Sequence, residues 1–126
     1  MTSITDRSQT ISEVVIEPYR IVVRTDLDWA VVLEVYDAVR TGEGAVIPPD
    51  EVPSTLESLT GRSVDKMAVD HPGTLSLTLD DRSRIDIGCD PSGRYEAWSV
   101  VAPDGVRAVA MPDGEVAFWD PPPVQQ

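Results

Sequence analysis

Several residue types are scarce in this sequence. It contains one cysteine, Cys89, one histidine, His71, and one lysine, Lys66. A lone cysteine excludes an internal disulfide and suits a reducing compartment. A lone histidine excludes a metal site with two histidine ligands and a Ser-His-Asp triad with a second base in reserve. The sequence therefore offers little material for catalysis or metal binding.

Two further absences concern membranes and nucleic acids. No apolar run approaches the roughly 20 residues that span a bilayer, and the first residues lack the basic-then-apolar pattern of a secretory signal. Acidic residues outnumber basic ones by 22 to 10, a net charge of −12. That field repels phosphates and anionic lipid, so we expect a cytoplasmic protein that binds neither nucleic acid nor membrane. The charge serves either solubility or attraction to a basic partner.

The length of 126 residues and an apolar content of 41% fit a single domain with its own core. We expect residues 1–9 to form a flexible N-terminus and residues 10–120 to form one α+β domain. The proline-rich residues 121–126 cannot pair in a sheet, and we expect a disordered tail there.

The C-terminal part of the chain alternates short apolar runs with turn signals. Pro103-Asp104-Gly105 and Pro112-Asp113-Gly114 separate three strand-like runs, and both triplets have the residue types of tight turns. A phosphate cradle would need a helix start or more glycines. The pattern predicts a three-strand meander over residues 95–119.

Two upstream segments match at a displacement of 54 residues. Residues 11–33 and 64–87 both have a strand, a turn and alternating apolar strands, so that Ile21 matches Leu75 and Val23 matches Leu77. The match indicates either a duplicated β-hairpin unit or a chance similarity between two amphipathic hairpins.

One short helix is expected after Asp50. Val52, Leu56 and Leu59 form an apolar stripe, Asp50 or Ser54 is suited to cap its start, and Gly61 is suited to end it. Residues 29–40 fit either a helix or a strand, and their valines favour strand. The fold class is α+β, mainly antiparallel sheet, with about eight short strands in meanders and one helix.

The ending of the chain carries a resemblance. Tyr95-Glu96-Ala97-Trp98, then Pro103-Asp104-Gly105, then Pro112-x-Gly-Glu-x-Ala-x-Trp resembles a family of small, uncharacterised actinobacterial proteins, classed as a domain of unknown function. The resemblance covers residues 61–119 well and the first half only in pattern. It implies a small cytoplasmic β-rich protein and brings no activity or catalytic residues.

The few reactive residues have plain structural interpretations. Cys89 and His71 are the only pair that would make a thiol–imidazole dyad, and each is expected at a strand end or a turn. The aspartates lack the spacing of a calcium loop. Asp is an ordinary turn former, which explains their positions without a metal. Trp98 and Trp119 are expected in the core, or one of them on an exposed interface. We expect no enzyme, no cofactor and no metal.

The favoured function is a protein-binding module. Small acidic families of this type resemble immunity proteins, which would neutralise a basic toxin domain by steric occlusion. The alternative is a small-ligand-binding or sensory domain with an apolar pocket between sheet and helix. Oligomeric state stays open. The residues expected to bind the partner form an acidic patch, namely Asp80, Asp81, Asp86, Asp90 and Glu96.

Overall fold

A computed structural model describes residues 2–70 and 73–119 of the chain. These residues form eleven strands, one 3-10 helix and one α-helix. The first half contains β1 (Thr2–Thr5), β2 (Gln9–Ile16), β3 (Ile21–Thr25), β4 (Ala30–Leu33), β5 (Val39–Thr41), η1 (Pro49–Glu51) and α1 (Val52–Glu57). The second half contains β6 (Ser63–Asp70), β7 (Thr74–Leu79), β8 (Arg84–Ile87), β9 (Trp98–Ala102), β10 (Gly105–Ala110) and β11 (Val116–Phe118).

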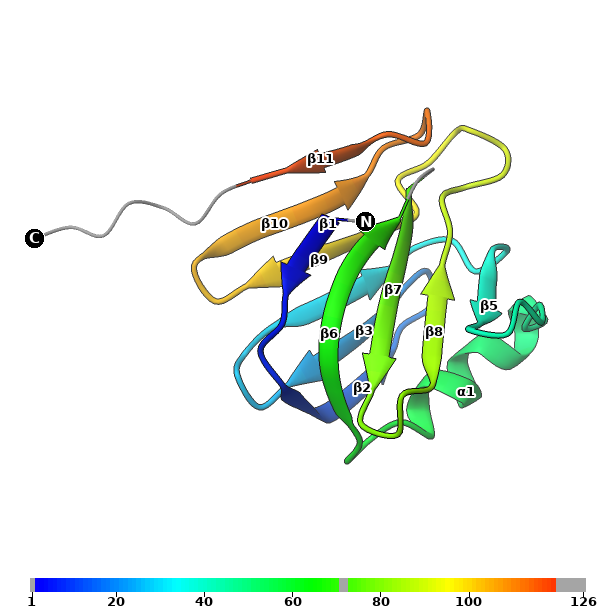
Figure 1. The fold of residues 1–126 in the computed structure, drawn as a ribbon. Coiled ribbons are helices and arrows are strands. Elements are labelled where there is room, and N and C mark those ends of the chain that lie inside the picture. Colours follow the sequence, from blue (N-terminus) through cyan, green and yellow to red (C-terminus); the bar gives the residue numbers. More distant parts are fainter. Residues whose placement is uncertain (1, 71–72, 120–126) are drawn as a thin grey trace, which may run out of the picture.

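The strands form two facing layers that enclose the core (Figure 1). Their hydrogen-bonding order is β11-β10-β9-β4-β3-β2-β6-β7-β8-β5, with β1 added beside β6. The layers meet where Gln9 and Thr10 of β2 pair with Val64 and Ser63 of β6. Beyond this contact β2 continues with β3 in the layer of β4, β9, β10 and β11. All strand pairs are antiparallel, which confirms the expected class of mainly antiparallel sheet with one short helix.

Two three-strand units of the fold are equivalent in register. We call β2-β3-β4 the first unit and β6-β7-β8 the second unit. The registers of β3–β4 and β7–β8 are identical at a displacement of 54 residues. Matching pairs are Ile21 with Leu33 and Leu75 with Ile87, Val22 with Val32 and Ser76 with Asp86, Val23 with Val31 and Leu77 with Ile85.

The turns of the two units repeat the same backbone geometry. Asp28 has a φ of 62° and the equivalent Arg82 has a φ of 70°. The N–H of Thr25 donates to Trp29 O (3.0 Å), and the N–H of Leu79 donates to Ser83 O (2.8 Å). A β-bulge also follows Ile11 in the first unit and Val64 in the second. The structure therefore favours a duplicated unit over a chance similarity between hairpins.

The core is built from the inward-facing residues of both layers. Ile21, Val23 and Leu33 of one layer face Leu75 and Leu77 of the other, and all are buried because alternate strand residues point to one side. Removing this apolar surface from water is the main stabilising term.

The two C-terminal tryptophans differ. Trp98 is 1% exposed, and its Nε1–H donates to Gly73 O at 3.1 Å. Trp119, just after the edge strand β11, is 49% exposed. Core packing is thus confirmed for Trp98 and wrong for Trp119, because no further strand covers the outer side of β11 in the described chain.

Both Pro-Asp-Gly triplets are hairpin turns, as predicted. The first joins β9 to β10 and the second joins β10 to β11, and φ is 139° at Gly105 and 88° at Gly114. This left-handed backbone favours glycine because it has no Cβ.

The helix differs in detail from expectation. Pro53 lies in its first turn, where the missing N–H costs nothing. Neither Asp50 nor Ser54 caps the start, because η1 precedes α1 and the N–H of Val52 bonds to Pro49 O. Residues 29–40 contain the predicted strand, β4, followed by a turn.

Within the segment expected to be flexible, residues 1–9, the structure describes one strand and the start of another. Thr2–Thr5 form β1, which pairs with Met67, Ala68 and Val69 of β6 along the edge left free where β2 leaves that layer. The expected tail at residues 121–126 lies outside the described residues. In the part that is described, no helix is long and apolar enough to cross a membrane.

Candidate functional site

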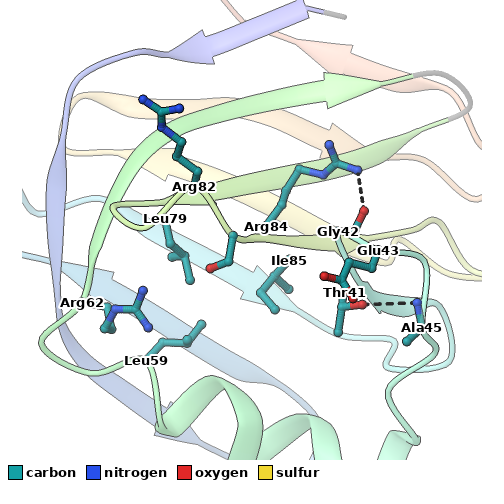
Figure 2. A pocket seen from close by; sticks show the side chains of 11 residues that line it. Thr41, Gly42, Glu43, Ala45, Leu59, Arg62, Leu79, Arg82, Arg84 and Ile85 are labelled. Carbon is teal, nitrogen blue, oxygen red and sulfur yellow. Dashed lines mark hydrogen bonds between the residues drawn. The ribbon is translucent and has the colours of Figure 1, made fainter.

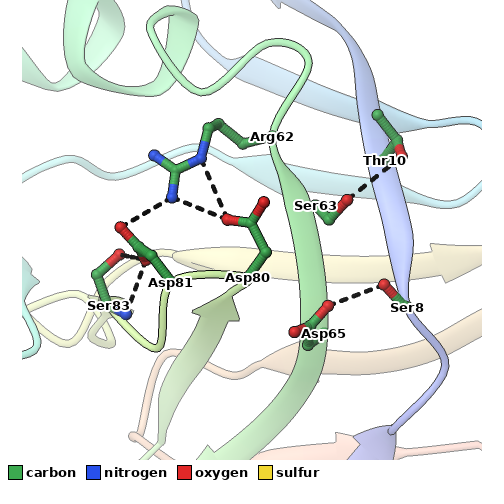
Figure 3. A network of polar contacts seen from close by, with 8 residues as sticks. All are labelled: Ser8, Thr10, Arg62, Ser63, Asp65, Asp80, Asp81 and Ser83. Atoms are coloured by element: carbon green, nitrogen blue, oxygen red, sulfur yellow. Dashed lines mark hydrogen bonds and ion pairs between the residues drawn. The ribbon is translucent and has the colours of Figure 1, made fainter.

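Two of the five predicted partner-binding residues share one arginine. Asp80 and Asp81 lie in the turn between β7 and β8, and the Arg62 guanidinium contacts both carboxylates, at 2.9 and 3.0 Å (Figure 3). Hydrogen bonds from the Ser83 hydroxyl and N–H lower the pKa of Asp81 to about 2. Hydrogen bonds to both aspartates raise the pKa of Arg62. The Arg62 guanidinium therefore already compensates part of the charge of both carboxylates.

Asp86 is also compensated within the protein. Its carboxylate accepts from Arg84 Nε at 2.9 Å and from the Ser76 hydroxyl at 2.8 Å. Its side chain is largely covered. We expected a concentrated negative patch on the β7–β8 turn and β8. Instead, arginines pair with the aspartates there.

Asp90 holds its own loop together and is not the exposed acid that we predicted. Only 6% of the residue is exposed. Its carboxylate accepts bonds from the Ser92 hydroxyl (2.6 Å) and from the N–H groups of Ser92, Arg94 and Tyr95 (3.0–3.1 Å). Bonds from Ser92 are the main cause that lowers its pKa. A carboxylate committed to local N–H groups has little left for a partner. Glu96, by contrast, is exposed as expected.

The loop that Asp90 orders forms one wall of a groove. We call it the tyrosine groove. Its volume is about 590 Å³, and its lining residues are Glu34, Val35, Tyr36, Asp37, Pro49, Asp90, Pro91, Ser92 and Tyr95. Tyr95 is 62% exposed, whereas burial raises the pKa of the half-buried Tyr36. Tyrosine is enriched at protein–protein interfaces.

The charge of the tyrosine groove has one sign. Glu34 and Asp37 are exposed, and within residues 2–70 and 73–119 neither makes an ion pair. No lysine or arginine lines the groove. Sequence reasoning missed Glu34, Tyr36 and Asp37 because they follow β4 in a stretch that we read as strand. The only signal was an aromatic residue between two acids.

A second groove lies between the β7–β8 hairpin, β5 and the end of α1. We call it the arginine groove (Figure 2). Its volume is also about 590 Å³, and its lining residues are Thr41, Gly42, Glu43, Ala45, Leu59, Arg62, Leu79, Arg82, Ser83, Arg84 and Ile85. Leu79 and Ile85 form an apolar floor between Arg62 and Arg84.

The arginines of this groove are held differently. Arg84 Nη2 donates to Gly42 O at 3.2 Å, and Gly42 N–H donates back to Arg84 O at 2.7 Å. The Arg82 side chain makes no hydrogen bond or ion pair with any described residue, whereas its backbone N–H donates to Leu79 O at 3.0 Å. Ser83 stands where the first unit has Trp29, which packs against the core. The small Ser83 side chain leaves space in the arginine groove.

Among the described residues, no three His, Cys, Asp or Glu side chains are placed to hold a metal ion. Cys89 is partly buried beside the turn at Gly114. His71 lies outside the described residues, so the expectation that Cys89 and His71 form no catalytic dyad stays a prediction.

Comparisons with known proteins bring a family and no activity. No curated protein and no solved structure is detectably similar to this chain. A family model matches residues 5–120, almost the whole chain, including both grooves. The chain belongs to DUF6188, a family of unknown function.

Proposed function

We propose that this protein is an acidic, cytoplasmic protein-binding module that docks a basic partner on the tyrosine groove. The observation that carries the proposal is that the exposed Tyr95 lines the same groove as Glu34 and Asp37, whose carboxylates make no ion pair in the described chain. The specific form that we favour is an immunity protein of actinobacterial origin, which would block a basic toxin domain by occupying its surface.

The groove has the chemistry to receive a cationic side chain. An arginine or lysine of the partner would lie against the face of Tyr95, where cation–π attraction contributes about 0.5–2 kcal/mol. Glu34 and Asp37 would supply charge-assisted hydrogen bonds without first breaking an ion pair of their own. The net charge of −12 would raise the rate of encounter more than the final affinity.

The tyrosine groove suits this role better than the predicted patch around Asp80 and Asp81. Those carboxylates would have to exchange Arg62 for a partner's cation, which gains little. Glu96, the one predicted residue that is exposed and without an ion pair in the described chain, follows Tyr95 directly and extends the negative rim.

Co-expression tests the function. A basic toxin domain encoded beside the gene is expressed with this chain, and growth is measured. We expect protection by the wild type and its loss with Tyr95→Ala plus Glu34→Lys. The matched control, Tyr19→Ala plus Asp65→Lys, changes an exposed tyrosine and an exposed acid away from the groove and keeps protection. Equal protection by both variants would overturn the proposed surface.

A second candidate function rests on the arginine groove. It lies between sheet and helix, as the ligand-binding alternative requires, and the Arg82 side chain makes no ion pair in the described chain. An apolar floor with guanidinium groups at the rim suits a small organic carboxylate. Titration with benzoate should change the amide chemical shifts of residues 82–85. We expect Arg82→Ala to weaken benzoate binding and Arg24→Ala to leave it unchanged. Absence of any shift would remove this candidate.

A further inference from the structure

The outer surface of one layer carries a row of mostly apolar side chains across six strands, interrupted at Ser99. Each residue of the row is the direct register neighbour of the next, and none belongs to the core cluster between the layers. In order from β2 to β11 the row is Val15, Val22, Val32, Ser99, Val109 and Ala117. Ala30, Val101 and Val106 continue it in the next row. We call these nine residues the valine face.

The second unit has polar residues at the same positions. Val22 and Val32 of the first unit correspond to Ser76 and Asp86, which face outward on the other layer. There the row continues to Arg40, and the neighbouring row contains Lys66, Thr78 and Arg84. Two units with one backbone thus have opposite outer surfaces, one polar and one apolar. Strand geometry alone does not require the valines.

The described chain leaves the valine face largely uncovered. Val15, Val32, Val101 and Val109 are partly exposed although they lie in the middle of strands. Val22 is only 5% exposed because neighbouring valines crowd it on both sides. The single α-helix, α1, lies beside β5 and β8 at the edge of the molecule (Figure 1). A contiguous apolar patch of this kind marks an interaction surface.

Most charges beside the valine face are paired, in contrast to the whole protein. Arg20 pairs with Glu17, and Arg107 pairs with Asp104. Arg24 lies directly opposite Glu13 in register, and Glu34, two residues after Val32, adds a negative charge at one border of the face. A surface on which most charges are compensated is one through which two chains of charge −12 approach with less repulsion.

The size and shape of the face also suit a second sheet. Six strands at about 4.8 Å spacing extend about 24 Å across the face, and its two rows lie about 7 Å apart along the strands. The face would form the apolar centre of an interface, and the charged rims would complete the roughly 800 Å² per partner of a stable one. Two such faces pack at about 10 Å with their valines interdigitated.

We propose that the protein forms a homodimer in which the valine faces of two copies pack against each other. A second copy supplies the flat, uncharged, β-branched surface that this face fits. The proposal does not depend on the tyrosine groove, which opens beside the loops at residues 34–37 and 90–95.

Sedimentation velocity of the full chain over a wide concentration range tests the proposal. We expect a dimer at high concentration. Val32→Asp, which copies Asp86, should weaken dimerisation at least about tenfold, because it places an unpaired charge in the interface. The matched control is Thr78→Asp, which adds the same charge to the polar layer between Lys66 and Arg84 and leaves the dimer intact.

Each outcome decides the proposal. A wild type that is monomeric throughout, a Val32→Asp variant that dimerises like the wild type, or equal weakening by Thr78→Asp would overturn it. Thermal unfolding establishes that Val32→Asp is folded. Should it not fold, Val22→Ser, which copies Ser76, takes its place and is expected to weaken the dimer in the same direction.

Discussion

Replacing Gly73 by alanine should destabilise the fold more than the same change at any turn glycine without close neighbours. A Cβ at Gly73 would lie 2.5 Å from Gly114 O, and φ there is +89°. Gly73 O also accepts the buried Trp98 indole N–H. Gly73 is therefore packed directly on the turn between β10 and β11, and its carbonyl helps to position the largest side chain of the core.

The expected cost has two parts. Left-handed backbone costs about 1–2 kcal/mol for alanine. Separating the two turns adds roughly 1–3 kcal/mol of packing strain, so Gly73→Ala should lose about 2–5 kcal/mol of unfolding free energy. Gly105, with φ +139° and no atom within 4 Å of its added Cβ, should lose only the backbone part.

Urea unfolding followed by tryptophan fluorescence measures both variants. We expect Gly73→Ala to unfold at clearly lower urea than Gly105→Ala, with both below the wild type. Equal midpoints for the two variants would refute the close packing of the two turns. A wild-type midpoint for Gly105→Ala would show that the first Pro-Asp-Gly triplet is not held in its left-handed turn.

Two further outcomes follow from the described contacts. Trp98→Phe should lose about 1–3 kcal/mol in the same urea assay, because it removes a buried hydrogen bond and leaves a gap, whereas Trp119→Phe should stay within about 0.5 kcal/mol of the wild type; a reversed order would contradict the placement of the two rings. Acid unfolding should depend on Asp81, whose pKa is lowered from 3.8 to about 2 in the folded protein. The stability that its carboxylate contributes is present above about pH 4 and is lost as the pH falls towards 2, so Asp81→Asn should flatten the pH dependence in this window. An unchanged slope would show that Ser83 and Arg62 do not stabilise the ionised form.

Much of the fold was predictable because its signals are local. The structure confirms the alternation in residues 75–79, the two Pro-Asp-Gly turns and the 54-residue match between strands. Each of these patterns consists of features that lie within single hairpins. Strand β1 was missed, and β5 was not separated from β4, because each is short and exists through a partner far away in sequence, β6 for β1 and β8 for β5. Pairing of that kind leaves no local pattern.

The candidate sites were less predictable, because charge compensation depends on which side chains meet in the folded structure. Asp80 and Asp81 read as free turn aspartates, but Arg62 reaches them from the start of β6. Asp90 read as an exposed acid, but its loop folds around it. The tyrosine groove joins two loops more than fifty residues apart, at Glu34 and Asp90. Only the comparison of equivalent strands exposed the valine face.

Titration of the isotope-labelled protein with a short arginine-rich peptide tests the central claim most directly. Amide chemical shifts report where the peptide binds, and an acidic peptide of equal length is the control. We predict shifts at residues 34–37 and 90–96, and their loss in Glu34→Lys plus Asp37→Lys but not in Asp80→Lys plus Asp81→Lys. Shifts confined to residues 80–86, or shifts that survive reversal of Glu34 and Asp37, would contradict binding of a basic partner at the tyrosine groove.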